Sequence, residues 1–159
     1  MCDTKSDIYD PVNHPSHYIK AAVMVQPIEL TARLNACLGQ AVNYIVRAPY
    51  KNNEVEDLEK AIFYLKKFNA VMFSDDYDGR DMGETALVLG RIFAKQSGHA
   101  YIKEALSCLF KWRCASEISI GRTISVLERQ IKAIKDPGKA SERFNDKTIG
   151  PDIEEDEQC

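Results

Sequence analysis

The sequence predicts an all-α protein in which five or six helices form a compact bundle with an extended N-terminal arm. Apolar residues recur at spacings of three and four in several segments, as they do along the buried face of a helix. Alternation typical of a strand is confined to one short stretch at 18–25. Hydrophobic residues make up 45% of the 159 residues, which is enough for one ordinary domain with a core.

The first helical pattern begins one residue before Pro27, which suits the first turn of a helix. Apolar residues continue at near-helical spacing to Leu38, and Gly39 either ends this helix or breaks it briefly. Residues 40–48 form a second helix or a continuation of the first. Pro49 ends it, because proline clashes with the preceding turn.

Four further helices follow. The helix predicted at 54–73 is the clearest, because its apolar residues form one stripe and its acids crowd the first turns, where the helix dipole favours them. Two more are predicted at 82–96 and 101–115. The last, at 119–135, carries one apolar stripe and ends at an Asp-Pro-Gly sequence.

The chain is predicted to form a single domain, 1–159, because no linker marks a boundary between two domains. Its N-terminal half, 11–73, carries the motifs, and its C-terminal half, 82–137, is helical. The acidic loop at 74–81 is the only plausible seam between them. Residues 138–159 are expected to form a flexible acidic tail, because acids dominate the end of the chain.

Composition excludes several classes of function. The net charge of −3 does not suggest a generic nucleic-acid binder. The five cysteines form no CxxC pair and show no zinc spacing, so we predict no metal site. The sequence has no signal-peptide pattern and no apolar run of membrane-spanning length, so we expect a cytoplasmic protein without a membrane partner.

A cluster of chemically active side chains precedes the first helix: His14, Pro15, Ser16, His17 and Tyr18. It holds two of the three histidines of the chain. Because Pro15 pushes His14 toward an extended conformation, we expect a stiff ribbon that holds its side chains in fixed directions. Imidazole is easily poised between acid and base near neutral pH. In the alternative, the histidines of a proline-braced arm only cap or pack.

A second polar cluster is predicted where the two helices around Pro49 carry residues at helical spacing. Tyr44 and Arg47 lie three apart, and Asp57, Lys60 and Tyr64 follow at spacings of three and four, so each set shares one face. The two cations are natural phosphate binders. In the alternative, Asp57 and Lys60 form an ordinary surface ion pair that contributes little.

Other patterns are weaker. Glu56 and Glu59 have the ExxE spacing with which helical nucleotide pyrophosphohydrolases hold Mg²⁺, but such a site needs a partner pair on another helix. The sequence contains neither a P-loop nor a GxGxxG motif. Four basic residues late in the chain are predicted to form a solvated helix face or, in the alternative, a partner surface: Arg122, Arg129, Lys132 and Lys135.

Four ordered blocks resemble the phage-encoded nucleotide kinase-like family, long catalogued as a domain of unknown function. They are HPSHY at 14–18, IE at 28–29, GQAVNYIVRA at 39–48 and the helical block at 56–65, and the resemblance covers about residues 11–68. It implies a phage enzyme without a P-loop that transfers a phosphoryl group to a deoxynucleoside monophosphate. A nucleoside triphosphate donor and Mg²⁺ are the cofactors that such a kinase would use.

The resemblance also implies site residues. Arg47 and Lys60 would bind phosphates, Asp57 would orient a partner, and His17 would donate a proton to a phosphate oxygen or relay one from it. A covalent phosphohistidine on His14 or His17 is an alternative. The remaining candidates would bind substrate, with the tyrosines stacking on a base or binding phosphate: His14, Ser16, Tyr18, Glu29, Tyr44, Lys51 and Tyr64.

Three departures from the family pattern stand out: Gln40 replaces Asn, Asn43 replaces Lys, and Pro49 replaces Gly. Losing the lysine removes one phosphate contact, which Lys51 would replace. The departure at Asn43 favours a non-catalytic nucleotide-binding protein, such as a sponge for a host signalling nucleotide. A Mg²⁺-dependent pyrophosphohydrolase and a structural or host-binding protein also stay open.

We also predict that the protein is a homo-oligomer. An arm of about 25 residues precedes the first helix, and two short helical halves suggest surfaces that one protomer does not cover. The predicted partners are therefore nucleotides and a second copy of the chain.

Overall fold

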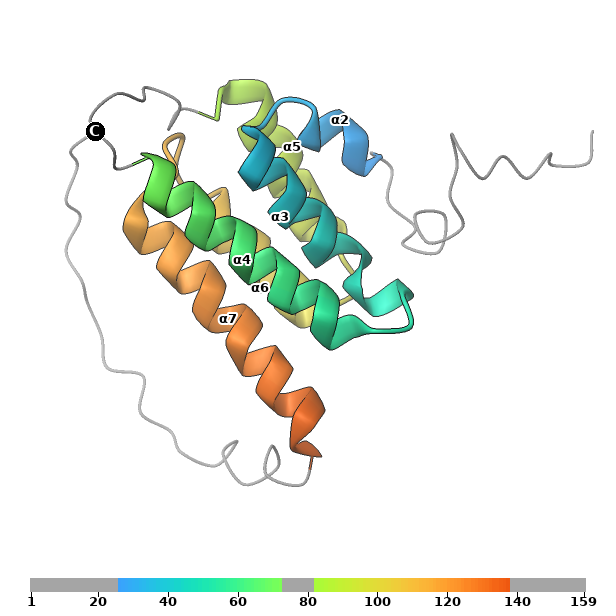
Figure 1. Cartoon of the computed structure of the whole chain (residues 1–159). Helices are drawn as coiled ribbons and strands as arrows, with labels where there is room; N and C mark the ends of the chain where they lie inside the picture. The colour runs from blue at the N-terminus through green and yellow to red at the C-terminus, as the bar shows by residue number, and fades with distance from the viewer. Residues whose placement is uncertain (1–25, 73–81, 138–159) are drawn as a thin grey trace, which may run out of the picture.

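The computed structural model describes residues 26–72 and 82–137 and confirms the all-α fold class (Figure 1). Six α-helices and one 3-10 helix occur within these two ranges, and no strand does. The predicted arm with its short strand at 18–25, the loop at 74–81 and the acidic tail lie outside the described residues. The elements are α2 (Pro27–Thr31), α3 (Ala36–Arg47), η1 (Ala48–Tyr50), α4 (Glu54–Met72), α5 (Glu84–Gln96), α6 (Ala100–Leu109) and α7 (Glu117–Lys135).

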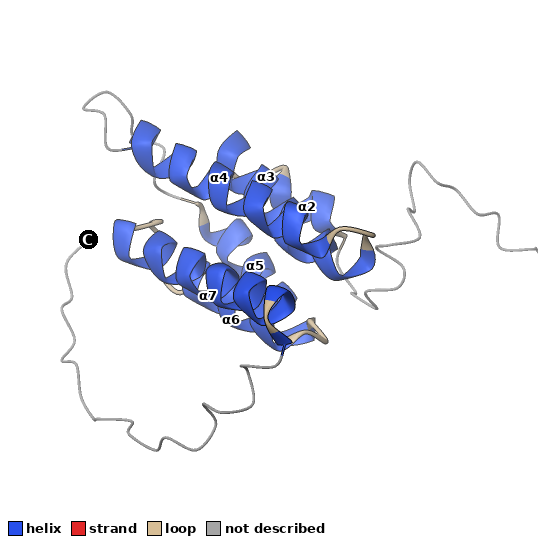
Figure 2. Ribbon diagram, turned by 60° about the horizontal axis from the view of Figure 1, so that its bottom comes forward, coloured by secondary structure: helices blue, strands red, loops and turns tan. Residues whose placement is uncertain are grey.

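The helices pack in a chain of neighbours rather than around one central helix. Helix α4 lies between α3 and α7, α7 also packs on α6, and α6 packs on α5, while α2 contacts both α3 and α5 (Figures 1 and 2). The interior is apolar, and its largest fully buried side chains come from all six α-helices or their immediate ends: Leu30, Leu38, Ile45, Leu58, Leu65, Phe68, Phe93, Leu106, Leu109, Phe110 and Ile120. None of the described helices combines the length and the apolar character needed to cross a bilayer.

The first predicted helix is interrupted earlier than expected. Helix α2 ends at Thr31, and α3 begins after Asn35, whose side-chain oxygen accepts a hydrogen bond from the backbone N–H of Cys37 at 2.9 Å. Gly39 is therefore neither an end nor a break, and lies inside α3. A Cβ atom there would come 3.0 Å from the carbonyl oxygen of Thr31, so the glycine lets the end of α2 approach α3 closely.

Helix α6 ends at Leu109, so the predicted helical span to residue 115 is wrong. Arg91 of α5 donates hydrogen bonds to the carbonyl oxygens of Phe110 at 3.1 Å and Lys111 at 2.8 Å. These carbonyls are thereby satisfied by a side chain and need no further helical turn. Trp112, which falls inside the helix predicted at 101–115, instead lies in the segment after α6 and is 58% exposed.

Helix α7 begins two residues earlier than predicted because of a capping box. The Ser116 hydroxyl accepts from the Ser119 N–H at 3.1 Å, and the Ser119 hydroxyl accepts from the Ser116 N–H at 3.0 Å. Two backbone donors at the helix start are thus satisfied reciprocally. Helix α4 occupies nearly the range predicted for it.

Candidate functional site

Five of the predicted site residues meet on one surface, which we call the α3–α4 face: Tyr44, Arg47, Asp57, Lys60 and Tyr64. The first two lie one turn apart on α3, and the other three lie along one side of α4. The short connection through η1 turns the chain back, so that the two helices pack side by side (Figure 1). Spacing on each helix and packing between helices together assemble the face.

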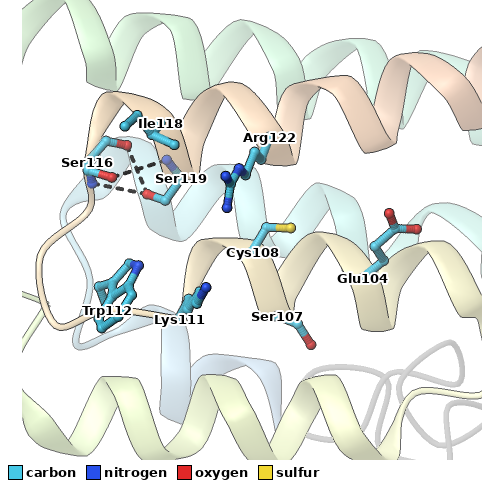
Figure 3. A pocket seen from close by; sticks show the side chains of 9 residues that line it. All are labelled: Glu104, Ser107, Cys108, Lys111, Trp112, Ser116, Ile118, Ser119 and Arg122. Atoms are coloured by element: carbon cyan, nitrogen blue, oxygen red, sulfur yellow. Dashed lines mark hydrogen bonds between the residues drawn. The ribbon is translucent and has the colours of Figure 1, made fainter. Parts of the chain in front are cut away.

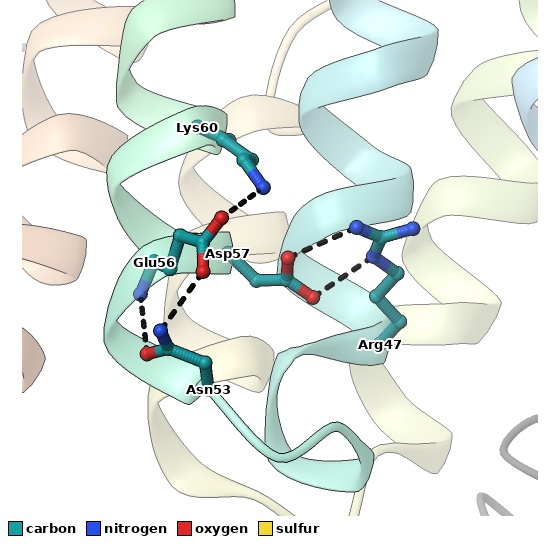
Figure 4. Close-up of polar contacts among 5 residues, drawn as sticks. All are labelled: Arg47, Asn53, Glu56, Asp57 and Lys60. Atoms are coloured by element: carbon teal, nitrogen blue, oxygen red, sulfur yellow. Dashed lines mark hydrogen bonds and ion pairs between the residues drawn. The ribbon is translucent and has the colours of Figure 1, made fainter.

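The centre of the face is a fork between Arg47 and Asp57 (Figure 4). The guanidinium Nε donates to Asp57 Oδ2 and Nη2 donates to Oδ1, each at 2.9 Å. The Asp57 residue is only 5% exposed, whereas the Arg47 side chain is 30% exposed. A two-pronged pair of this kind fixes the orientation of the guanidinium plane as well as its charge.

The alternative of an Asp57–Lys60 surface pair is therefore wrong. Asp57 pairs with Arg47 across the two helices, and Lys60 pairs with Glu56, one turn earlier on α4, at 2.5 Å. Burial explains the choice, because a nearly buried carboxylate needs a partner that satisfies both of its oxygens. The partner that Asp57 orients is thus Arg47.

Aromatic rings lie directly against these charges. The rings of Tyr44 and Tyr64 are stacked, with centroids 5.7 Å apart and planes 15° from parallel. The Arg47 Cζ lies 4.3 Å from the Tyr44 ring centroid, and the Lys60 Nζ lies 5.8 Å from it. Both distances are within the range of a cation–π contact. The face therefore combines two cations with a pair of planar rings.

The Lys60–Glu56 pair lies on the solvent side of this face. The side chains of Lys60 and Glu56 are 43% and 52% exposed. Their hydrogen bond raises the pKa of the Lys60 ammonium and lowers the pKa of the Glu56 carboxyl. Glu56 also accepts from the Asn53 side chain at 2.8 Å, which ties it to the start of α4 (Figure 4). Because an exposed ion pair contributes little to stability, another anion can easily replace Glu56 as the partner of Lys60.

The structure gives no support to an ExxE magnesium site. Glu56 is engaged by Lys60, and Glu59 accepts from Lys135 of α7 at 2.9 Å. Across the described ranges, no group of three or more His, Cys, Asp and Glu residues is placed to hold a metal ion. The second carboxylate pair that such a site needs is therefore not found in this part of the chain.

The other predicted site residues are not part of this cluster. Glu29 is exposed on α2, and Lys51 is exposed in the turn after η1. Among the described residues, neither forms a hydrogen bond or ion pair with the α3–α4 face. The four candidates of the N-terminal motif lie outside the described residues: His14, Ser16, His17 and Tyr18. Their assigned roles require His17 and Arg47 to meet at one phosphate site, and this convergence stays a prediction.

The predicted basic face on α7 is exposed but not purely solvated. Arg129 forms an ion pair with Glu104 of α6, and Lys135 pairs with Glu59 of α4. These contacts cross between helices, so their partners have no characteristic spacing in the sequence.

A cluster that sequence reasoning missed lies at the start of α6. His99 makes an edge-to-face contact with Tyr50, with centroids 5.5 Å apart, and lies 6.1 Å from the ring of Tyr101. Burial, reinforced by the nearby Glu54 carboxylate, raises the pKa of the Tyr101 phenol. The residues come from three separate elements, so no local spacing signals this cluster.

Comparison with known proteins corrects the resemblance drawn from the sequence. Residues 12–66 match the family model DUF3310, whose description is a protein of unknown function. Nothing in this match links the chain to a nucleotide kinase family, so that assignment is wrong. No curated protein matches the chain. No solved structure matches it either. The matched segment includes α2, α3 and most of α4, and thus the whole α3–α4 face.

Proposed function

We propose that the chain binds a nucleotide on the α3–α4 face and transfers a phosphoryl group to a deoxynucleoside monophosphate bound there. The observation that carries this proposal is the Arg47–Asp57 fork beside the stacked tyrosines. It places a guanidinium of fixed orientation next to planar rings, and these are the two kinds of group that can contact the phosphates and the base of a nucleotide. The segment matched by the family model also includes every residue of this face.

The phosphates are assigned to Arg47 and Lys60. Asp57 holds the guanidinium in one orientation, so little rotational freedom is lost when a ligand binds. Lys60 is held by an exposed partner, Glu56, which a phosphate can replace at small cost. Arg47 thus supplies a fixed charge, and Lys60 supplies an adaptable one.

The base is assigned to the tyrosine pair. Planar rings that are stacked and partly exposed offer a surface on which any base can stack, with or without specific hydrogen bonds. Lys60 lies one turn from Tyr64 on α4 and near the ring of Tyr44. A nucleotide that stacks on either ring therefore brings its phosphates within reach of the cations.

The N-terminal motif is assigned to the reaction on the sequence alone. On the described part of the face, two cations are matched by the carboxylates of Asp57 and Glu56. Additional donors are therefore needed to neutralise phosphate charge, and His17 is our candidate. In the reaction, the γ-phosphoryl group of a triphosphate moves to a phosphate oxygen of the acceptor, and two nucleoside diphosphates leave.

Purified full-length protein incubated with a triphosphate, Mg²⁺ and the deoxynucleoside monophosphates tests both parts of this proposal. Anion-exchange chromatography separates free, bound and converted nucleotides. Diphosphate products that disappear in Arg47→Ala but persist in Arg129→Ala would support phosphoryl transfer. Nucleotide retained without conversion, again dependent on Arg47, would support binding and overturn transfer. Absence of both would overturn the assignment of this face.

A further inference from the structure

A groove between α6 and α7 lies apart from the α3–α4 face. Its volume is about 280 Å³, slightly below the range of about 300–1,000 Å³ that is typical of sites for drug-sized ligands. One wall comes from the last turns of α6 and the segment after it, and the other comes from the first turns of α7 (Figure 3). A ligand that fits here is small, with room for about one ring and one charged group.

The groove has an excess of positive charge. Arg122 reaches from α7 toward α6, and Lys111 follows the end of α6 (Figure 3). Within the described residues, neither cation forms an ion pair. The acid in the lining, Glu104, is paired with Arg129. Two unmatched cations therefore share one concave surface, which favours an anion.

The thiol of Cys108 in the groove does not repel an anion. Burial raises the pKa of Cys108, with a further contribution from Glu104, despite the opposing effects of Arg122 and Lys111. The side chain is accordingly neutral near neutral pH. The groove thus keeps its positive charge.

An exposed indole completes the lining. Trp112 is the only tryptophan of the chain and is 58% exposed. The Lys111 Nζ lies 5.2 Å from its ring, so a cation is already held beside this aromatic surface. Large aromatic side chains that stay exposed next to cations are enriched at binding surfaces.

The groove is held in a fixed shape by hydrogen bonds within its lining and next to it. The reciprocal hydrogen bonds of Ser116 and Ser119 fix the start of α7 (Figure 3). The two hydrogen bonds from Arg91 fix the chain just before Trp112. A site with a preformed wall loses little entropy when its ligand binds.

We propose that the α6–α7 groove binds a small anion that carries a planar ring, with Arg122 and Lys111 contacting the charged group and Trp112 stacking on the ring. This site is independent of the α3–α4 face, because the two share no residue. The expected ligand carries a phosphate or carboxylate group attached to a single planar ring.

Fluorescence of Trp112 gives a direct test, because no other tryptophan contributes to the signal. Full-length protein is titrated with phenyl phosphate, inorganic phosphate and phenol at constant ionic strength. We expect a saturable change with phenyl phosphate at a concentration where either fragment alone gives little change. Arg122→Ala should weaken binding about tenfold to a hundredfold, the range for losing one charge-assisted hydrogen bond.

Arg33→Ala in the turn after α2 is the matched control, since it removes an exposed arginine that does not line the groove. Arg122→Gln, checked by circular dichroism, separates loss of charge from loss of folding. Equal responses to phenyl phosphate and inorganic phosphate would overturn the role of the ring. Unchanged binding by both Arg122 variants, or no saturable response in the parent, would overturn the site. Arg47→Ala should leave this titration unchanged.

Discussion

Substitution of Gly90 by alanine tests the close approach of α5 to Phe110. A Cβ atom at this position of α5 would lie 2.3 Å from Cγ of Phe110 and 2.4 and 2.5 Å from its two Cδ atoms. Ordinary contacts begin at 3.4 Å, so the ring would have to retreat by about 1 Å. Phe110 has no exposed surface and is held among neighbouring side chains, so it has little room to retreat.

Two opposing effects decide the magnitude. Alanine is favoured over glycine inside a helix by about 1 kcal/mol. Overpacking a filled core costs about 1–3 kcal/mol, and the ring lies directly in the path of the new methyl group. Contacts this short place the overpacking cost at the upper end of its range, so we expect a net loss of about 2 kcal/mol for Gly90→Ala.

Gly121→Ala on α7 is the matched control, because a Cβ atom there meets nothing within 4 Å. This variant should gain about 0.5–1 kcal/mol from helix propensity alone. Thermal unfolding should then show Tm lower by roughly 4–8 °C for Gly90→Ala and higher by roughly 1–4 °C for Gly121→Ala. A Gly90→Ala protein as stable as the parent would refute the direct contact of α5 with Phe110.

Three further predictions concern ionisation, the fork and assembly. Because the pKa of Tyr101 is raised, the unfolded chain loses this proton first above about pH 10, so stability falls as pH rises there. In urea unfolding, Tyr101→Phe should reduce the slope of the free energy of unfolding against pH by up to about 1.4 kcal/mol per pH unit. A slope equal to that of the parent would contradict the burial of the phenol. Asp57→Asn should lower the free energy of unfolding by about 1–3 kcal/mol because it breaks the fork to Arg47, whereas Glu56→Gln on the surface should lower it little. Equal losses of stability for the two variants on urea unfolding would contradict the difference in burial between Asp57 and Glu56. Light scattering should give a mass above that of one chain at micromolar concentration, and a monomer mass would refute homo-oligomerisation.

Local periodicity predicted most of the helices, and contacts between helices explain where it failed. The stripes of α4 and α7 are properties of single segments, so their positions follow from spacing. The end of α6 depends on Arg91, about twenty residues earlier, whose hydrogen bonds have no local signature. Gly39 and Gly90 both permit close packing, but a glycine in a helical pattern does not reveal what lies opposite it.

For the candidate site, too, helical spacing predicted only the contacts that lie within a single helix. Spacing placed Tyr44 beside Arg47 and Lys60 beside Tyr64, because these pairs lie on single helices. It failed for Asp57, whose partner is on the other helix and whose burial depends on how the two helices pack. The exposure of Trp112 in the groove between α6 and α7 was also missed, since the carbonyls just after α6 are satisfied by Arg91 of α5.

Calorimetric titration of the parent protein and its arginine variants with deoxynucleoside monophosphates tests the central claim most directly. Arg47→Ala should weaken binding about tenfold to a hundredfold, and Arg47→Lys should also weaken it, because an ammonium cannot reproduce the fork to Asp57. Arg129→Ala, which removes an exposed arginine outside the α3–α4 face, should bind like the parent. If Arg47→Ala binds like the parent while Arg129→Ala fails, the nucleotide site lies in the C-terminal half and the α3–α4 assignment is wrong.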